Sequence, residues 1–103
     1  MNIVIMKGRL TSKPEIRVSQ SGEYRVTSFS IAINEGKNPD GTIGTTFVNC
    51  EAWNDKADFI CQYFDKGQGI SIQGKYKKTA KEDKEFHTIQ VFQAFFELND
   101  PKL

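Results

Sequence analysis

Only one stretch of this chain has the periodicity of a helix, and strand-like segments lie on both sides of it. Ala57, Ile60, Cys61 and Phe64 fall at positions i, i+3, i+4 and i+7, which is the spacing of one buried helix face. A helix of roughly three turns inside a chain of strands strongly limits the folds that are possible.

Strand patterns cover most of the remaining chain. They occur at 2–10, at 15–19 with 23–34, at 45–53, around 70–72, and from 86 to about 98. Turn residues at 20–22 make 15–34 either a hairpin or one bent strand. We expect surface loops at 35–44, which holds three glycines and a proline, and at 77–85, which has no apolar anchor.

A helix between the third and fourth strands of a small all-β chain indicates a five-stranded Greek-key barrel, the OB-fold. Periodicity alone leaves an SH3-like barrel open. The length of 103 residues suits a single domain, which we expect over 1–98, with a short C-terminal tail at 99–103.

The ends of the helix and part of the core can also be predicted. Asn54 or Asp55 is suited to cap the helix start, and Lys66-Gly67 to close it with a cation and a left-handed residue. On the 23–34 strand three alternating apolar residues are expected in the core: Phe29, Ile31 and Ile33.

The first strand is apolar on both faces, through Ile3, Val4, Ile5 and Met6. A strand with one solvated face should alternate, so another part of the chain or a second subunit must cover the other face. We therefore expect a homo-oligomer. Four late phenylalanines are expected in core or subunit contacts: Phe86, Phe92, Phe95 and Phe96.

The strand at 45–53 places its large rings in polar company. Phe47, Asn49, Glu51 and Trp53 share one face, while the other face carries the small apolar residues Val48, Cys50 and Ala52. Rings intended for the core would lie on the apolar face. Phe47 and Trp53 are therefore predicted to be displayed for stacking on flat ligands, with Asn49 beside them.

The net charge of +1 hides local concentrations of lysine. We expect the hairpin before the last strand to contact phosphates through a set of lysines: Lys75, Lys77, Lys78, Lys81 and Lys84. Earlier strands add cations at Arg9, Lys13, Arg17 and Arg25, although Arg9 could equally form a structural ion pair. Tyr76 could stack on a base or pack beneath the hairpin. Glu51 would repel phosphate.

No pattern for catalysis or metal binding is present. The two cysteines, Cys50 and Cys61, fit neither a disulfide framework nor a zinc site and are expected to be buried thiols. His87 is isolated and expected at the surface. No cofactor, phosphate-cradling loop or nucleophile motif is indicated. Without a charged leader or an apolar span, we expect a cytoplasmic protein that does not bind membranes.

Several segments together resemble the bacterial single-stranded DNA-binding protein family. They are Asn2-x-Val4-x-Met6-x-Gly8-Arg9-Leu10-Thr11-x-x-Pro14-Glu15-x-Arg17, then Gly22 followed by Phe29-Ser30-Ile31-Ala32, then Phe47-x-Asn49 through Trp53, and Tyr63-Phe64-x-Lys66-Gly67-x-x-Ile70-x-Ile72-x-Gly74. The resemblance implies an OB-fold, usually a homotetramer, that binds single-stranded DNA with little sequence preference and has no catalytic activity. Phe47 and Trp53 match stacking positions of the family.

Two departures from the family pattern bear on function. Family chains usually continue into a flexible tail with an acidic end that recruits replication and repair enzymes, whereas this sequence stops at Leu103. Recruitment through such a tail is therefore doubtful. Regions where some members carry further stacking aromatics here read Glu35-Gly36-Lys37 and Lys78-Thr79-Ala80-Lys81.

We therefore expect a protein that coats single-stranded DNA in replication, recombination or repair, with a tetramer favoured over a dimer. One alternative is a dimeric, primosome-type accessory protein of the same fold. Another is an OB module for protein interaction that binds little DNA, which the near-neutral charge and Glu51 would favour.

Overall fold

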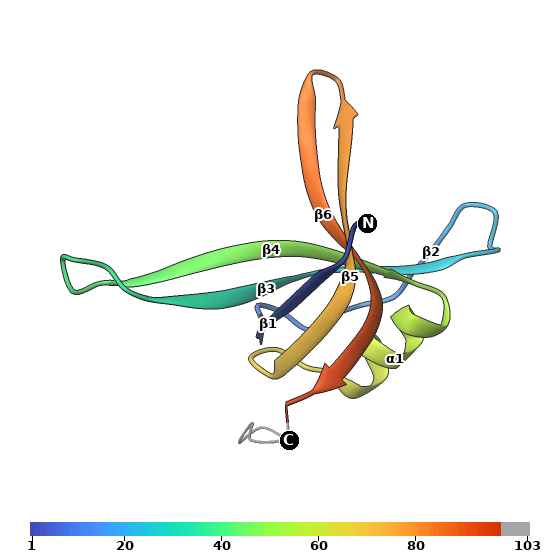
Figure 1. The fold of residues 1–103 in the computed structure, drawn as a ribbon. Coiled ribbons are helices and arrows are strands. Elements are labelled where there is room, and N and C mark those ends of the chain that lie inside the picture. Colours follow the sequence, from blue (N-terminus) through green and yellow to red (C-terminus); the bar gives the residue numbers. More distant parts are fainter. Residues whose placement is uncertain (98–103) are drawn as a thin grey trace.

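A computed structural model describes residues 1–97 as one small, mostly β structure with a single helix (Figure 1). In chain order its elements are β1 (Val4–Leu10), β2 (Arg17–Val18), β3 (Arg25–Lys37), β4 (Ile43–Trp53), α1 (Asp55–Tyr63), β5 (Gly69–Lys81) and β6 (Lys84–Phe96). The predicted boundary at 98 and the predicted tail at 99–103 lie outside the described residues.

The strands form one sheet that closes into a ring. Their order is β1-β5-β6-β4-β3-β2, and β1 also pairs with β3 at Arg9 and Leu10. All pairings are antiparallel except β4 with β6, which run parallel at Cys50 and Glu51. With β2 and β3 taken together as the predicted bent strand, the expected order of five strands and the helix position are confirmed.

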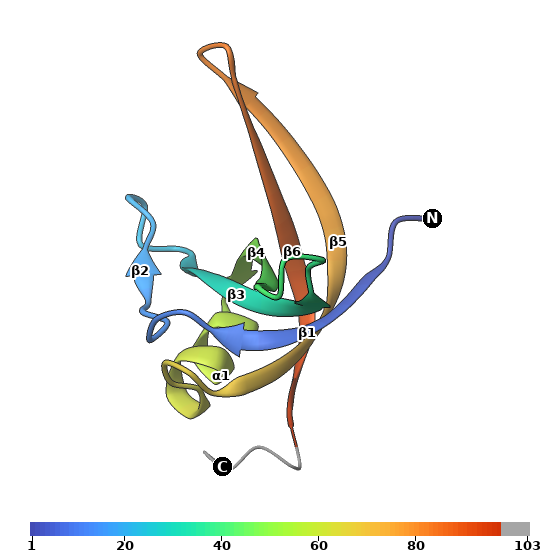
Figure 2. The ribbon, with the colours of Figure 1, turned by 90° about the vertical axis from the view of Figure 1, so that its left-hand side faces the viewer.

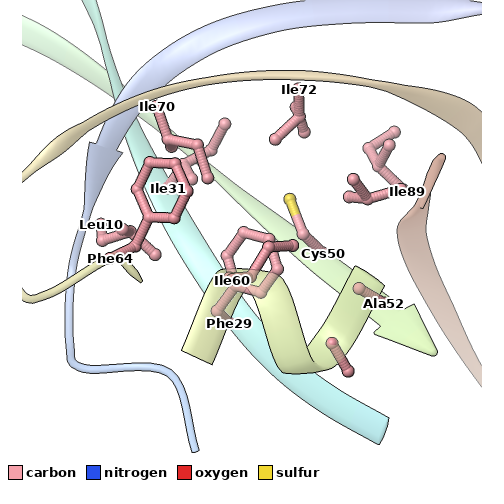
Figure 3. Close-up of a cluster of buried hydrophobic side chains, with 12 residues drawn as sticks. Leu10, Phe29, Ile31, Cys50, Ala52, Ile60, Phe64, Ile70, Ile72 and Ile89 are labelled. Atoms are coloured by element: carbon pink, nitrogen blue, oxygen red, sulfur yellow. The ribbon is translucent and has the colours of Figure 1, made fainter. Parts of the chain in front are cut away.

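The core fills this ring and is covered at one end by α1 (Figure 3). Phe29 and Ile31 are buried as predicted, while Ile33 only packs against the edge of the cluster. Isoleucines from β5 and α1 complete the centre: Ile60, Ile70 and Ile72, each fully buried. Burial of this apolar area is the main stabilising contribution to the fold.

The helix forms where predicted but ends earlier. Phe64 leaves the helix with an extended backbone, which carries its ring into the core, where it stacks on Phe96 with centroids 4.7 Å apart. Gly67 has the expected positive φ of 80°, but it lies in the following turn and donates its N–H to the Leu10 carbonyl. Asn54 takes the predicted N-cap position, but its side chain makes no capping hydrogen bond, because its Oδ1 instead accepts the Arg25 N–H at 3.0 Å.

Two long hairpins project from the ring as arms (Figures 1 and 2). The β3–β4 arm turns at 38–42, and the β5–β6 arm turns at Glu82 and Asp83, both with positive φ, as a two-residue hairpin requires. The predicted loops at 35–44 and 77–85 were therefore wrong in extent. Cross-strand backbone hydrogen bonds continue along both arms. This pairing does not require apolar side chains in the paired segments.

The first strand alternates more than its composition suggests. Val4 and Met6 pack against the core, whereas Ile3 and Ile5 are 55% and 74% exposed.

The two cysteines differ in burial. Cys50 is buried, which raises the pKa of its thiol to about 12. Cys61 is only half-buried, so the prediction of a buried thiol was wrong for this residue. The helix found in the described residues, α1, is too short and too polar to cross a membrane.

Candidate nucleic-acid interface

The outward face of β4 carries the two rings singled out from the sequence. Phe47 is 66% exposed and Trp53 is 38% exposed, whereas Cys50 and Ala52 point into the core. The predicted division of these residues between an outward and a core-facing side of β4 is thus confirmed. The two rings are six positions apart along the strand, so they lie roughly 20 Å apart on the same surface.

A polar groove lies between these rings. In the β3–β4 register Ser28 is opposite Glu51 and Ser30 is opposite Asn49, so their side chains share the outward face. The resulting hollow, which we call the groove, has a volume of about 400 Å³. Its lining includes Ser12, Ser28, Ser30, Asn49, Glu51 and Thr88. Hydroxyl, amide and carboxylate groups therefore face any ligand held between the rings.

Two of the predicted lysines border this groove. The sheet register places Lys75 beside Gln90 and Gln90 beside Glu51, in one row across three strands. Lys77 Nζ lies 3.8 Å from Glu51 Oε1, so its side chain is on the same face. Lys81 lies four residues after Lys77 in β5, so strand alternation places its side chain on the same face further along the β5–β6 arm. These three lysines extend the groove with positive charge.

Lys78 and Tyr76 belong to the opposite face of the arm. Lys78 forms an ion pair with Glu85 at 3.1 Å. The Tyr76 ring stacks on His87 at a centroid distance of 5.7 Å, and its hydroxyl hydrogen-bonds to His87 Nδ1. Tyr76 nonetheless remains 42% exposed. His87 lies at the surface, as expected.

A second hollow of about 420 Å³ lies where β4 and the β5–β6 arm diverge. Phe47 and Phe86 both line it, and Tyr76 contributes from the other face. Phe86 is 51% exposed, and Phe92, Phe95 and Phe96 are also exposed by more than a third. These four rings are therefore not buried in the core of the single chain, and the other part of the expectation, that they serve subunit contacts, stays a prediction. Phe96 alone packs closely on the core residue Phe64.

The arginines differ in their surroundings. Arg17 donates a hydrogen bond to Ser28 Oγ at 2.9 Å, at the edge of the groove. Arg9 lies in one row with Ala32 and Phe47 and donates to the Gly67 carbonyl at 2.9 Å. Both can face a strand of nucleic acid that crosses the outward surface.

Arg25 serves the fold instead. Its guanidinium makes two-pronged contacts with Asp58, the shortest at 2.7 Å, and lies 3.5 Å from Asp55. The hydrogen bond and charge of Asp58 raise the pKa of Arg25, and the same hydrogen bond lowers the pKa of Asp58. This pair joins the start of β3 to α1, so Arg25 is not available as a surface cation.

Sequence reasoning missed two aromatic residues near the groove. Tyr24, 48% exposed, approaches Trp53 edge-on with centroids 6.3 Å apart. Tyr24 lies an even number of residues before Ser28 and Ser30, so strand alternation places all three on the same face. This alternation was the signal in the sequence that could have identified Tyr24. Phe86 shares the phase of Thr88 in the same way, but placing it required knowing that strand pairing continues into the arm.

Known proteins provide an independent comparison. Residues 1–91 match the model of the "Single-strand binding protein family". A single-stranded DNA-binding protein of Fusobacterium nucleatum is 35% identical over 85 residues, which cover 80% of this chain and 54% of that protein. Single-stranded DNA-binding protein B of Bacillus subtilis is 32% identical over 85 residues, covering 82% of this chain and 74% of its own length.

The fold has a close counterpart among solved structures. An SSB domain from Synechococcus sp. superposes with a TM-score of 0.75, covering 91% of this chain and 93% of that one at 12% identity. The OB-fold expectation is thereby confirmed. This chain spans little more than half the length of relatives such as those of Fusobacterium nucleatum and Oceanobacillus iheyensis, which it covers to 54% and 56%.

Proposed function

Because the chain belongs to the single-strand binding protein family, we propose that it binds single-stranded DNA along its outward face, with little sequence preference and no catalysis. Its role would be in replication, recombination or repair. The observation that carries this proposal is the pair of exposed rings, Phe47 and Trp53, on either side of a polar groove.

The two rings supply binding that any base can use. Every base has a flat π-face, and stacking on a protein aromatic is typically worth ~1–3 kcal/mol per base. Asn49 lies between the rings and can hydrogen-bond to base edges or sugars. Tyr76 would contribute through the second hollow, which it shares with Phe47 and Phe86.

The cations supply the sequence-independent part. Lys75, Lys77 and Lys81 follow the outward face of the β5–β6 arm, and Arg17 lies at the groove edge. A strand stacked on both rings would pass these groups with its phosphates. Arg9 would extend the path beyond Phe47, and Lys78 would act from the back of the arm.

The single tryptophan gives a direct test, because all tryptophan fluorescence comes from Trp53, which is one of the two proposed stacking rings. Titration with an unstructured single strand of mixed dC and dT should quench its fluorescence, and the quenching should weaken as salt rises. Emission that stays constant at low salt, with no binding by anisotropy of a labelled strand, refutes the proposal. A duplex of the same sequence serves as the control and should bind much more weakly.

We also infer a homo-oligomer, with a tetramer favoured over a dimer. Ile3 and Ile5 expose apolar side chains on β1, and Phe95 adds a half-exposed ring two strands away, across from Ser71. Measurement of the mass of the assembly in solution tests this inference, and Ile5→Lys should lower the mass of the assembly. A monomer at micromolar concentration contradicts it, and a dimer supports the accessory-protein alternative.

The cellular setting follows from the ligand. A protein that coats single-stranded DNA works where replication and repair take place, so we propose a cytoplasmic location. The protein-interaction alternative draws on the near-neutral net charge and on the acidic Glu51 within the groove. Retention of this protein on immobilised single-stranded DNA, with elution by salt, contradicts that alternative.

A further inference from the structure

The two arms leave the ring in different directions, and the second hollow lies where they separate (Figure 1). β4 and β6 run parallel and pair first at Cys50 and Ile89. Three residues before this pair, on each strand, are Phe47 and Phe86. Both rings line the hollow, one from each arm, roughly 10 Å along their strands from the point where pairing begins. The parallel register thus brings together two rings that are far apart in the sequence.

Both rings are open to a ligand. Phe47 is 66% exposed and Phe86 is 51% exposed. Neither contacts another aromatic ring among residues 1–97. Tyr76 also lines the hollow, but one face of its ring is already stacked on His87. Phe86 is therefore the ring best placed to meet the second face of a base that stacks on Phe47.

The hollow suits a flat, largely apolar group. On its core side the lining is apolar, through Met6, Val48 and Ile89. A cavity of about 150 Å³ can hold a benzene ring, so the volume of about 420 Å³ leaves room for a base. The carboxylate of Glu85, at the edge of the hollow, is paired with Lys78 at 3.1 Å, which offsets its charge toward phosphates.

The second hollow continues the groove. Asn49 and Thr88 line both. Lys84 lies two residues before Phe86 in β6, so strand alternation places both side chains on one face. Lys77 is the register partner of Thr88, on the other side of Phe86 along the arm. A strand of DNA that leaves the groove would therefore meet cations on both sides of this ring.

We propose that Phe47 and Phe86 hold one base of the DNA strand between them, which makes the second hollow a sandwich site for a nucleobase. This rests on the proposed function, because the strand must first follow the outward face. Both rings contact the flat faces that all bases share, so the site accepts any base. Phe86 thus adds a stacking position on the β5–β6 arm to the two on β4.

Two single substitutions and their combination test whether the rings hold the same base. Phe86→Ala should weaken the binding of oligo-dT about tenfold, because one stack is lost. Tyr63→Ala, at the end of α1 and equally 51% exposed, should leave the affinity unchanged. Without Phe86 the base is held on one side only and leaves the hollow more readily. The double variant Phe47→Ala, Phe86→Ala should therefore lose less affinity than the product of the two single losses.

Fluorescence provides a readout that does not depend on the size of the affinity change. Trp53→Phe keeps a stacking ring at position 53 and removes the native fluorescence, so Phe86→Trp in this background places the single tryptophan in the hollow. Saturation with oligo-dT, followed by anisotropy of a labelled strand, should quench this tryptophan. A tryptophan introduced by Tyr63→Trp in the same background should keep its emission.

Four results overturn the inference while the proposed function stands. They are native affinity in Phe86→Ala, single losses that multiply in the double variant, a lower mass of the assembly in Phe86→Ala, and unchanged emission from the tryptophan at position 86 in the saturated complex. The lower mass would assign Phe86 to a subunit contact. Failure of the native protein to bind oligo-dT at low salt refutes the proposed function itself.

Discussion

Replacing Phe47 with alanine separates binding from folding more cleanly than any other change in the groove. The side chain is 66% exposed. For a ring that presents roughly 200 Å² in all, this leaves about 130 Å² in solvent. A base stacked on one side would cover about half of that, or ~65 Å², which corresponds to ~1.6 kcal/mol at ~25 cal/mol per Å². We expect the dissociation constant to rise about 15-fold.

The same exposure predicts a small effect on stability. Ring atoms that already face solvent contribute little to the core, and the range of strand propensities in exposed positions is only ~1 kcal/mol. The Phe47→Ala protein should therefore unfold within ~1 kcal/mol of the native protein. By contrast, Ile72→Ala, at a fully buried site, should cost ~2–5 kcal/mol.

Anisotropy of a labelled single strand measures the affinity, and thermal or urea unfolding measures the stability. Tyr63→Ala is a matched control, because Tyr63 is 51% exposed at the end of α1, away from the groove and from the surface proposed for subunit contacts. Native affinity in Phe47→Ala would refute the stacking argument. An equal loss in both variants, at unchanged solution mass, would refute the choice of surface.

Three further changes test other parts of the structure. Lys75→Gln should reduce the slope of log affinity against log salt by about 0.7, as expected for one phosphate contact on a single strand, whereas Lys66→Gln, outside the groove, should not. Asp58→Asn should lower the unfolding temperature at neutral pH by removing the Arg25 ion pair. Because folding lowers the pKa of Asp58, that stabilisation is present above the unfolded value of ~3.9 and is lost as the pH falls through the folded value, so both proteins should converge in acid. Gly74→Ala should unfold more readily, since a Cβ there would lie 2.2 Å from a carbonyl oxygen of β6.

Features with a short sequence range could be predicted well. The two faces of β4 follow from strict alternation over 47–53, and the helix follows from spacing over 57–64. Both patterns depend on neighbouring residues alone. The end of the helix was missed because Phe64 is drawn out by its contact with Phe96, a residue more than thirty positions away.

The arms could not be predicted because their stability comes from pairing rather than from composition. Treating 77–85 as a loop left the predicted lysines as an undivided group: Lys75, Lys77, Lys78, Lys81 and Lys84. In the observed hairpin Lys78 lies on one face and the other four lie on the opposite face, since Lys84 is the direct partner of Lys81. The division that decides which cations border the groove follows from a backbone register, and no local signal in the sequence specifies it.

The position of these lysines depends finally on Gly74. The β5–β6 register shifts between Gln73 and Gly74, and an extra residue on one strand bends the pair. The far end of the β5–β6 hairpin leaves the ring as an arm (Figure 1). Only glycine fits, because the β6 backbone passes where a side chain would be. Gly74 thus links the closure of the ring to the direction in which Lys75 and Lys77 run along the groove, so a residue without a side chain helps to shape the binding surface.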